Sequence, residues 1–129
     1  MKKVLCLALA MVFLFSGCGL SSREENLGVF TLKKSFSYDK KYYAVMDYVT
    51  YDGVETAIVD VYLSVDDSRV QAIKVARSAD FWGYCWEKDT HNIWVQSGDK
   101  GVFCYSLKGK KWKLNESAER PDYIVSKYD

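Results

Sequence analysis

The sequence predicts an all-β domain, an antiparallel meander folded as a small sandwich, an open barrel or a curled sheet. From Val29 onward, short apolar, β-branched and aromatic runs are separated by polar turns about every ten residues, which is typical of consecutive antiparallel strands. Aromatic residues make up 16% of the chain, and their flat side chains pack well on a pleated surface. We therefore expect one β-rich domain over residues 28–129.

Each apolar run in this region is short enough for a strand, and turn-forming residues lie between the runs. Asp52-Gly53 is the strongest hairpin signal, because both positions of the tightest hairpin turn need a positive φ. The segments that fit strands are residues 29–32, 42–50, 56–64, 71–77, 81–87, 92–96, 102–107 and 111–114. Beyond them, Pro121 favours the first position of a helix, so we expect a short helix at 121–128, with an edge strand as the alternative.

The two central hairpins allow a register to be predicted. If Asp89-Thr90 is a hairpin tip, Trp86 pairs with Ile93 and Tyr84 with Val95, while Cys85 and Trp94 face the other side. The resulting core face would carry Trp82, Tyr84, Trp86, Ile93 and Val95, and would continue through Phe103, Tyr105 and Leu107. Residues 81–114 loosely resemble a β-propeller blade, but the chain is too short for the at least four blades that a propeller needs.

The N-terminus has the form of an export signal. A basic start, Met1-Lys2-Lys3, precedes the uncharged run 4–15 and then Ser16-Gly17-Cys18. That run is well short of the roughly 20 residues that span a bilayer as a helix. The alternative is an ordinary secretory signal with an incidental cysteine.

Residues 15–18, Phe-Ser-Gly-Cys, resemble the lipobox of bacterial lipoproteins, although Phe15 stands where leucine is commonest. The resemblance implies that residues 1–17 are removed and that Cys18 carries a diacylglycerol at the new N-terminus. It also implies a lipid-anchored protein on the extracytoplasmic face of the cell membrane. Residues 18–27 would then be a flexible tether, and the rest of the chain is similar in type to small bacterial lipoproteins.

The other reactive side chains suggest no metal site and no cofactor. Cys85 and Cys104 lie on strands separated by the Trp94 strand, roughly two spacings of 4.8 Å apart, so a disulfide between them is disfavoured. His91 is expected at an exposed hairpin tip, and two distant cysteines with one histidine are too few ligands for zinc. Without residues 1–17 the chain has 16 basic and 17 acidic side chains, and no basic stripe or patch suggests nucleic acid as a partner.

These features predict a non-enzymatic binding or scaffolding module at the cell envelope, with an envelope protein or a glycan as partner. Candidate ligand-binding residues are the aromatic side chains Trp82, Trp94, Trp112, Tyr42 and Tyr43, although packing in the core is the alternative role for each. The rival hypothesis is a small cell-wall hydrolase or another carboxylate-dependent enzyme, which would use some of Asp47, Asp60, Asp66, Asp67 and Glu87. Two carboxylates facing each other in a cleft, about 5 to 9 Å apart, would favour hydrolysis.

Overall fold

The computed structural model describes residues 27–129. The predicted signal, Cys18 and the tether up to residue 26 lie outside the described residues. Leu27 was expected to be part of the tether, but it is partly buried and packs against the core, so the folded domain already includes it.

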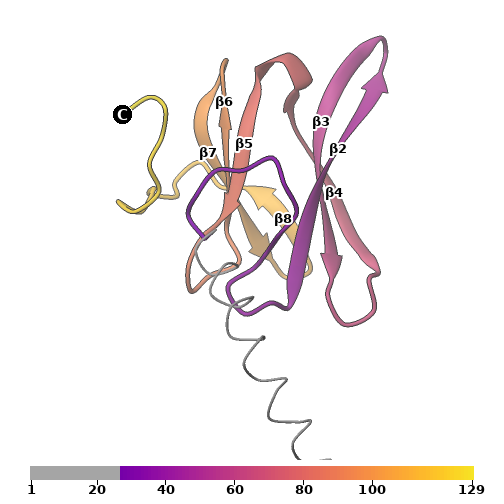
Figure 1. The fold of residues 1–129 in the computed structure, drawn as a ribbon, viewed down its shortest axis with the longest axis vertical. Coiled ribbons are helices and arrows are strands. Elements are labelled where there is room, and N and C mark those ends of the chain that lie inside the picture. Colours follow the sequence, from indigo (N-terminus) through magenta and orange to yellow (C-terminus); the bar gives the residue numbers. More distant parts are fainter. Residues whose placement is uncertain (1–26) are drawn as a thin grey trace, which may run out of the picture.

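The domain consists of two four-stranded antiparallel sheets that face each other, so the predicted all-β meander is confirmed (Figure 1). Each sheet is a simple meander, with strand orders β1-β2-β3-β4 and β5-β6-β7-β8, and a short 3₁₀ turn (η1) connects the two sheets. The elements are β1 (Ser35–Phe36), β2 (Tyr42–Tyr51), β3 (Val54–Leu63), β4 (Arg69–Arg77), η1 (Ser78–Asp80), β5 (Phe81–Trp86), β6 (Ile93–Ser97), β7 (Gly101–Lys108) and β8 (Lys111–Leu114).

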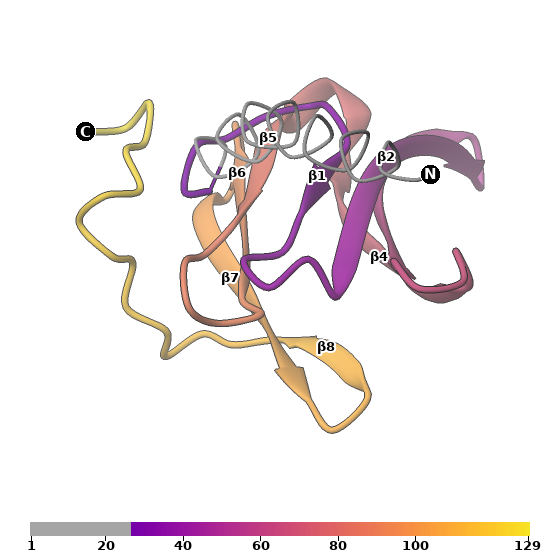
Figure 2. The same ribbon diagram turned by 60° about the horizontal axis from the view of Figure 1, so that its bottom comes forward.

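Two predicted elements are wrong. Residues 29–32 form only an isolated bridge between Thr31 and Tyr84, and the first strand is instead the two-residue β1. The expected helix at 121–128 is absent, and the segment after β8 runs in turns along the outer side of the second sheet (Figure 2). Proline supplies only a local preference for a helix start, whereas Ile124 is anchored by burial against β5, β6 and β7.

Tight turns follow the sequence signals. The β2–β3 hairpin turns at Asp52 and Gly53, with φ of 49° and 79°, as the Asp-Gly pair predicts. Asp67 and Asp89 also adopt positive φ in their hairpin turns, a conformation that aspartate tolerates better than most residues. These turns fix the register of the strands that they join.

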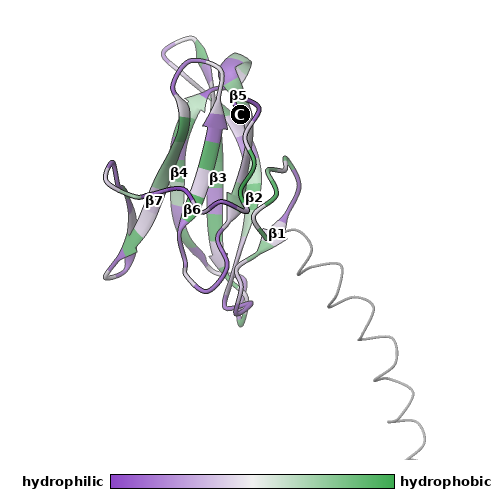
Figure 3. Cartoon of the chain, turned by 90° about the vertical axis from the view of Figure 1, so that its left-hand side faces the viewer, coloured by the Kyte–Doolittle hydropathy of each residue, from purple (hydrophilic) through white to green (hydrophobic). Residues whose placement is uncertain are grey.

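The main core lies between the two sheets. Alternate residues of each strand point inward, and bands of hydrophobic and hydrophilic residues alternate along the strands (Figure 3). The buried members are Tyr42, Ala44, Ala57, Val59, Val61, Ile73, Val75, Phe81, Tyr84, Trp86, Ile93, Val95 and Trp112. Burial of so many large side chains is the dominant stabilising contribution.

The predicted register of the central hairpins is confirmed, with one exception at Trp82. Tyr84 pairs with Val95, Cys85 with Trp94, and Trp86 with Ile93. A bulge between Phe81 and Gly83 shifts the alternation, so Phe81 enters the core and Trp82 points outward. Trp82 was expected on the core face and is instead 37% exposed.

A second, smaller core covers the outer face of the second sheet. Cys85, Trp94 and Cys104 project there from adjacent strands and are buried together with Ile124. Phe30, from the N-terminal segment, and Ala118, from the C-terminal segment, pack against them. The two ends of the described chain therefore both lie on this face, where they leave a groove between them.

Candidate binding groove

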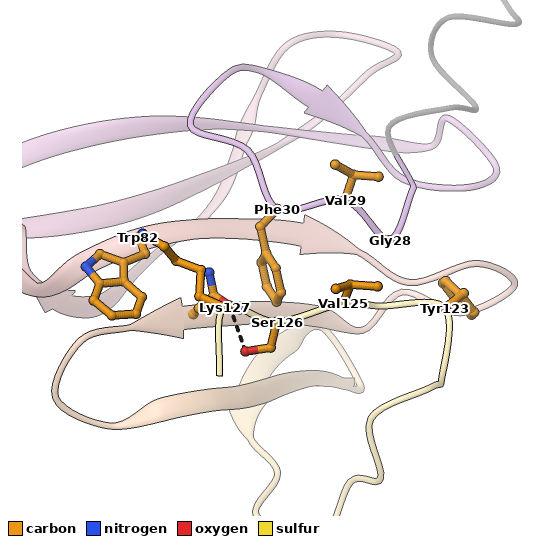
Figure 4. Close-up of a pocket in the computed structure, with 9 residues that line it drawn as sticks. Gly28, Val29, Phe30, Trp82, Tyr123, Val125, Ser126 and Lys127 are labelled. Atoms are coloured by element: carbon orange, nitrogen blue, oxygen red, sulfur yellow. Dashed lines mark hydrogen bonds between the residues drawn. The ribbon is translucent and has the colours of Figure 1, made fainter. Parts of the chain in front are cut away.

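The groove is an open apolar channel of about 550 Å³ beside β5 (Figure 4). Residues 28–30 form one wall and residues 123–127 form the other, with Trp82 at one end. The lining residues are Gly28, Val29, Phe30, Trp82, Gln96, Tyr123, Val125, Ser126 and Lys127. An open channel with mainly apolar walls is a typical ligand-binding surface.

Backbone hydrogen bonds fix the N-terminal wall on β5. The Gly28 N–H donates to the Trp86 carbonyl at 2.8 Å, and Thr31 and Tyr84 exchange bonds of 2.9 and 3.1 Å. Gly83 allows this close approach, because at its φ of +140° a Cβ would lie 3.3 Å from Phe30 and from the Thr31 backbone. The same glycine is part of the bulge that turns Trp82 outward, so one local feature sets both the wall and the end of the groove.

Side-chain hydrogen bonds hold the C-terminal wall. The Gln96 Oε1 atom accepts hydrogen bonds from the Ser126 hydroxyl at 2.8 Å and from the Lys127 N–H at 2.7 Å. Farther along, the Tyr123 hydroxyl accepts the Lys88 N–H at 2.7 Å. The polar atoms named here are already engaged inside the protein, so the groove offers a ligand mainly apolar contacts.

Several large apolar side chains stay exposed around the groove. Val125 is 68% exposed and Val29 is 54% exposed, on opposite walls. The Trp82 ring stacks on Tyr128 with centroids 5.6 Å apart, and the Lys127 ammonium lies 4.3 Å from the Trp82 ring centroid. These exposed apolar side chains make the groove a candidate interaction surface.

Of the predicted aromatic ligand-binding residues, Trp82 is the one that lines the groove. Trp94, Trp112 and Tyr42 are 3%, 2% and 9% exposed, so these three take the alternative role of packing in the core. The indole N–H of Trp94 donates to Glu87 at 2.7 Å and that of Trp112 donates to the His91 carbonyl at 2.7 Å. These internal partners allow both tryptophans to be buried.

Tyr43 lies elsewhere, on the outer face of the first sheet. Its ring stacks on Tyr62, with centroids 5.2 Å apart, and its hydroxyl donates to Asp67 at 2.8 Å. The Lys34 ammonium lies 4.4 Å from the same ring centroid. Tyr43 and Trp82 therefore belong to different faces and do not form a common patch.

The candidate catalytic carboxylates do not meet in the groove. Asp66 accepts hydrogen bonds from Ser68 in the β3–β4 turn, and Glu87 accepts hydrogen bonds from Thr90, Asn92 and Trp94. No carboxylate is among the residues that line the groove in the described part of the chain. The geometry therefore gives the hydrolase hypothesis no paired acid and base in this groove.

Asp60 is the exception among these carboxylates, because it is buried on the outer face of the first sheet. It is 3% exposed, and the Arg69 Nε atom lies 3.5 Å from its Oδ1 atom without hydrogen-bond geometry. Burial raises the pKa of Asp60, the Arg69 charge offsets part of this rise, and the nearby Asp47 charge adds to it. The Asp60 carboxylate is thus incompletely compensated in the folded protein.

His91 joins the two sheets and is not a freely exposed tip residue as predicted. Its Nε2 atom lies 2.9 Å from Asp39 Oδ2, and the Tyr42 ring contacts the imidazole edge-on at 5.0 Å. Its side chain is 22% exposed. The long reach from the β5–β6 loop to residue 39 could not be predicted from local sequence.

Cys85 and Cys104 are free, buried thiols on either side of Trp94. Burial raises the pKa of Cys104 to about 11 and raises the pKa of Cys85 even further above its ordinary value. Both thiols are therefore protonated at neutral pH and behave as packing groups. Within residues 27–129 there is no cluster of three histidine, cysteine or carboxylate side chains that could hold a metal ion.

Comparison with known proteins identifies no relative, since no family model, no curated protein and no solved structure matches the chain. In residues 27–129, no helix has the length and apolar character needed to cross a bilayer. The assignment of a role therefore depends on the groove and on the sequence of the N-terminus.

Proposed function

We propose that the protein is a bacterial lipoprotein, anchored through Cys18 on the extracytoplasmic face of the membrane, and that its domain is a non-enzymatic binding module. The ligand is an extended apolar segment of an envelope protein, bound in the groove between residues 28–30 and 123–127. The observation that carries the proposal is the exposure of Val29 and Val125 on the two walls. The lipobox-like sequence at residues 15–18 supports the anchor.

A protein segment fits the groove better than a glycan does. Sugar recognition needs free hydrogen-bond donors and acceptors beside the aromatic platform. In this groove, however, the Ser126 hydroxyl and the Lys127 backbone N–H both donate to the side-chain oxygen of Gln96. The Trp82 ring is also partly covered by Tyr128 and Lys127. Apolar side chains of an extended segment would instead bury the exposed valines and gain about 25 cal/mol per Å² of apolar area removed from water.

The position of the groove restricts where the partner lies. Gly28 follows Cys18 by ten residues, so the chain can hold the groove no more than about 35 Å from the anchor, at roughly 3.3–3.6 Å per extended residue. The partner segment is therefore close to the membrane surface, as expected for an envelope protein. Tethering also raises the local concentration of the module around such a partner.

The anchor is tested by replacing Cys18→Ala in the full chain and fractionating the cells. We expect the protein to move from the membrane fraction to the soluble fraction, because it can no longer accept a diacylglycerol. Cys6→Ala is the matched control, since this cysteine lies inside the predicted signal and is removed with it. Unchanged membrane retention of the Cys18→Ala protein would contradict the anchor.

The groove is tested by placing photoreactive benzoylphenylalanine at position 125 of the full chain and irradiating living cells. We expect a discrete crosslinked protein that disappears when Val29→Glu is added on the opposite wall. Benzoylphenylalanine at Val65 is the control, because this valine is 87% exposed in the β3–β4 turn, away from the groove. Equal crosslinking from positions 65 and 125, or none from position 125, would refute the groove as the binding surface.

A further inference from the structure

The first sheet has an open edge along β2. β1 is two residues long and pairs only with Tyr43 and Ala44, while β2 continues to Tyr51. Beyond Ala44, no described strand therefore lies beside this edge. In Figure 1 the β2–β3 hairpin leans away from the second sheet toward its tip, so the second sheet does not cover it.

The register identifies which backbone groups this edge presents. The Tyr42 carbonyl accepts the Ser37 N–H, and the Ala44 carbonyl accepts the Tyr84 hydroxyl, so even-numbered residues of β2 point away from β3. Because backbone direction alternates along a strand, the N–H and C=O groups of Met46, Tyr48 and Thr50 face the open edge. These are the groups that an added strand would use.

Asp47 partly protects this edge. Its Oδ1 atom accepts the Tyr48 N–H at 2.9 Å, in an exposed position. Charged side chains on edge strands are a common device against indiscriminate strand pairing. An incoming strand can take the place of the Asp47 carboxylate as the acceptor of the Tyr48 N–H. The negative charge of Asp47 then favours strands that carry positive charge.

The side chains around the edge define the chemistry of a partner. Four large apolar residues near the hairpin tip, Tyr48, Val49, Tyr51 and Val54, are between 37% and 45% exposed. Three acidic residues, Asp47, Asp52 and Glu55, lie among them, and none of the ion pairs in residues 27–129 includes any of the three. One cation lies beside them, since the Lys74 ammonium is 3.9 Å from the Tyr51 ring centroid. The surface is thus apolar, and its three carboxylates outnumber this one lysine.

We propose that the open edge of β2 binds an extended segment carrying lysine or arginine from another polypeptide, by strand addition along Met46, Tyr48 and Thr50. Main-chain hydrogen bonds supply the pairing, and the acidic side chains select a basic segment. A second copy of this chain is a poorer occupant. Antiparallel pairing of two β2 edges through Tyr48 would place the two Asp47 carboxylates on the same face as diagonal neighbours, where like charges repel.

This site is separate from the groove and does not depend on the lipid anchor. The edge belongs to the first sheet, whereas the groove covers the outer face of the second sheet. With both sites occupied, one domain would hold two polypeptides at once.

The test uses the full chain in detergent micelles and a capped heptapeptide of alternating lysine and valine as the probe. Amide hydrogen exchange is followed residue by residue by NMR. We expect slower exchange at Met46, Tyr48 and Thr50 when the peptide binds, and affinity about tenfold lower for the matching peptide of glutamate and valine. Absence of protection at these three amides, or equal affinity for the two peptides, would overturn the proposal.

Two variants separate charge from backbone pairing. Asp52→Asn removes a negative charge and keeps a residue type that tolerates the positive φ, so it should lower the affinity for the lysine peptide about two- to fivefold. Asp99→Asn, in the β6–β7 turn, is the control and should leave this affinity unchanged. Edge strands tolerate proline where the missing N–H faces outward, as it does at position 50. Thr50→Pro removes this donor, so the peptide should no longer protect the amides of β2 from exchange. Peptide-induced chemical-shift changes confined to Val29 and Val125 would place the peptide in the groove. Amide protection that rises with protein concentration alone would indicate a second copy of the chain. Either result would refute the proposed occupant of the edge.

Discussion

The side-chain amide of Gln71 pairs with the backbone of Trp112 as a neighbouring strand would. Gln71 Nε2 donates to the Trp112 carbonyl at 3.0 Å, and the Trp112 N–H donates to Gln71 Oε1 at 2.7 Å. Gln71 lies on β4, the edge of the first sheet, and Trp112 lies on β8, the edge of the second. One side chain therefore joins two sheets that share no backbone ladder.

Removing this amide should weaken the sheet-to-sheet contact. We expect Gln71→Ala to lower the free energy of unfolding by about 1–3 kcal/mol, because a backbone donor and acceptor lose their partner. Urea unfolding measures the loss. Lys110→Ala, in the exposed β7–β8 turn, is the control that should have little effect, and an equal loss in both variants would argue against the pairing.

Gly83→Ala tests the seating of the N-terminal wall. A Cβ at this φ of +140° would lie 3.3 Å from Phe30 and the Thr31 backbone, so strain and crowding should both lower stability. Gly109→Ala is the matched control, because it also has a positive φ but no atom within 4 Å. We expect the Gly83 variant to lose about 1–3 kcal/mol more, with the fastest new amide exchange at residues 28–31. Equal losses of stability in the two variants would show that the close approach of Phe30 and Thr31 to Gly83 does not hold the wall in place.

Asp60→Asn should change how stability depends on pH. Burial raises the folded-state pKa of Asp60 above its ordinary value of 3.8, so the folded protein favours the protonated form. The stability that Asp60 provides when protonated is therefore lost as pH rises from 3.8 through the folded pKa. We expect the Asn variant to lack this decrease and to be at least as stable as the parent at pH 7. Urea midpoints at several pH values measure this, and a large loss at pH 7 would mean that the Arg69 ion pair outweighs burial.

Asp39→Asn should change the pH dependence of stability in the opposite direction. Burial by itself raises the pKa of Asp39, but hydrogen bonds from the Lys41 N–H, His91 and Ser37 outweigh it and lower the pKa below 3.8. This stabilisation is present above pH 3.8 and is lost as pH falls through the folded pKa. Because Asp39 is one third exposed, we expect a loss of only about 0.5–1 kcal/mol at pH 7 that disappears in acid. A loss that persists at low pH would contradict an ionic origin.

The two thiols should report global unfolding. Cys85 and Cys104 are buried, and the pKa of Cys104 is raised to about 11, so little thiolate exists at neutral pH. We expect neither residue to react with iodoacetamide in the native protein and both to react in 8 M urea. Mass spectrometry after brief labelling measures this. Rapid native labelling of Cys104 alone would mean that the C-terminal segment opens independently of the sheets.

Local sequence predicted the strands and the central register well, because Asp-Gly and Asp-Thr turns set the pairing and the period of two sets the faces. It failed at Trp82, because a bulge next to Gly83 reverses the alternation. The isolated glycine within the strand was the available signal for this bulge. Local sequence left the roles of Trp94 and Trp112 open between ligand binding and packing in the core. Their indole N–H groups find partners at Glu87 and His91, and only the folded chain reveals these contacts.

The groove could not be predicted, because its walls are irregular segments placed by distant contacts. Val29 stood in a segment expected to be a strand, and Val125 and Lys127 stood in a segment expected to be a helix. The available signal was the apolar run Tyr123-Ile124-Val125 near a polar terminus. That pattern indicates burial of one side but not the partner that it packs on.

The walls of the groove come from residues 28–30 and 123–127, so nearly the whole domain separates them along the chain. All eight strands of the described residues precede residue 115, so a chain that folds from its N-terminus can complete both sheets while the second wall is still missing. On the proposed function, ligand binding would therefore be the last property that the domain acquires, because the groove is complete only when both walls are in place.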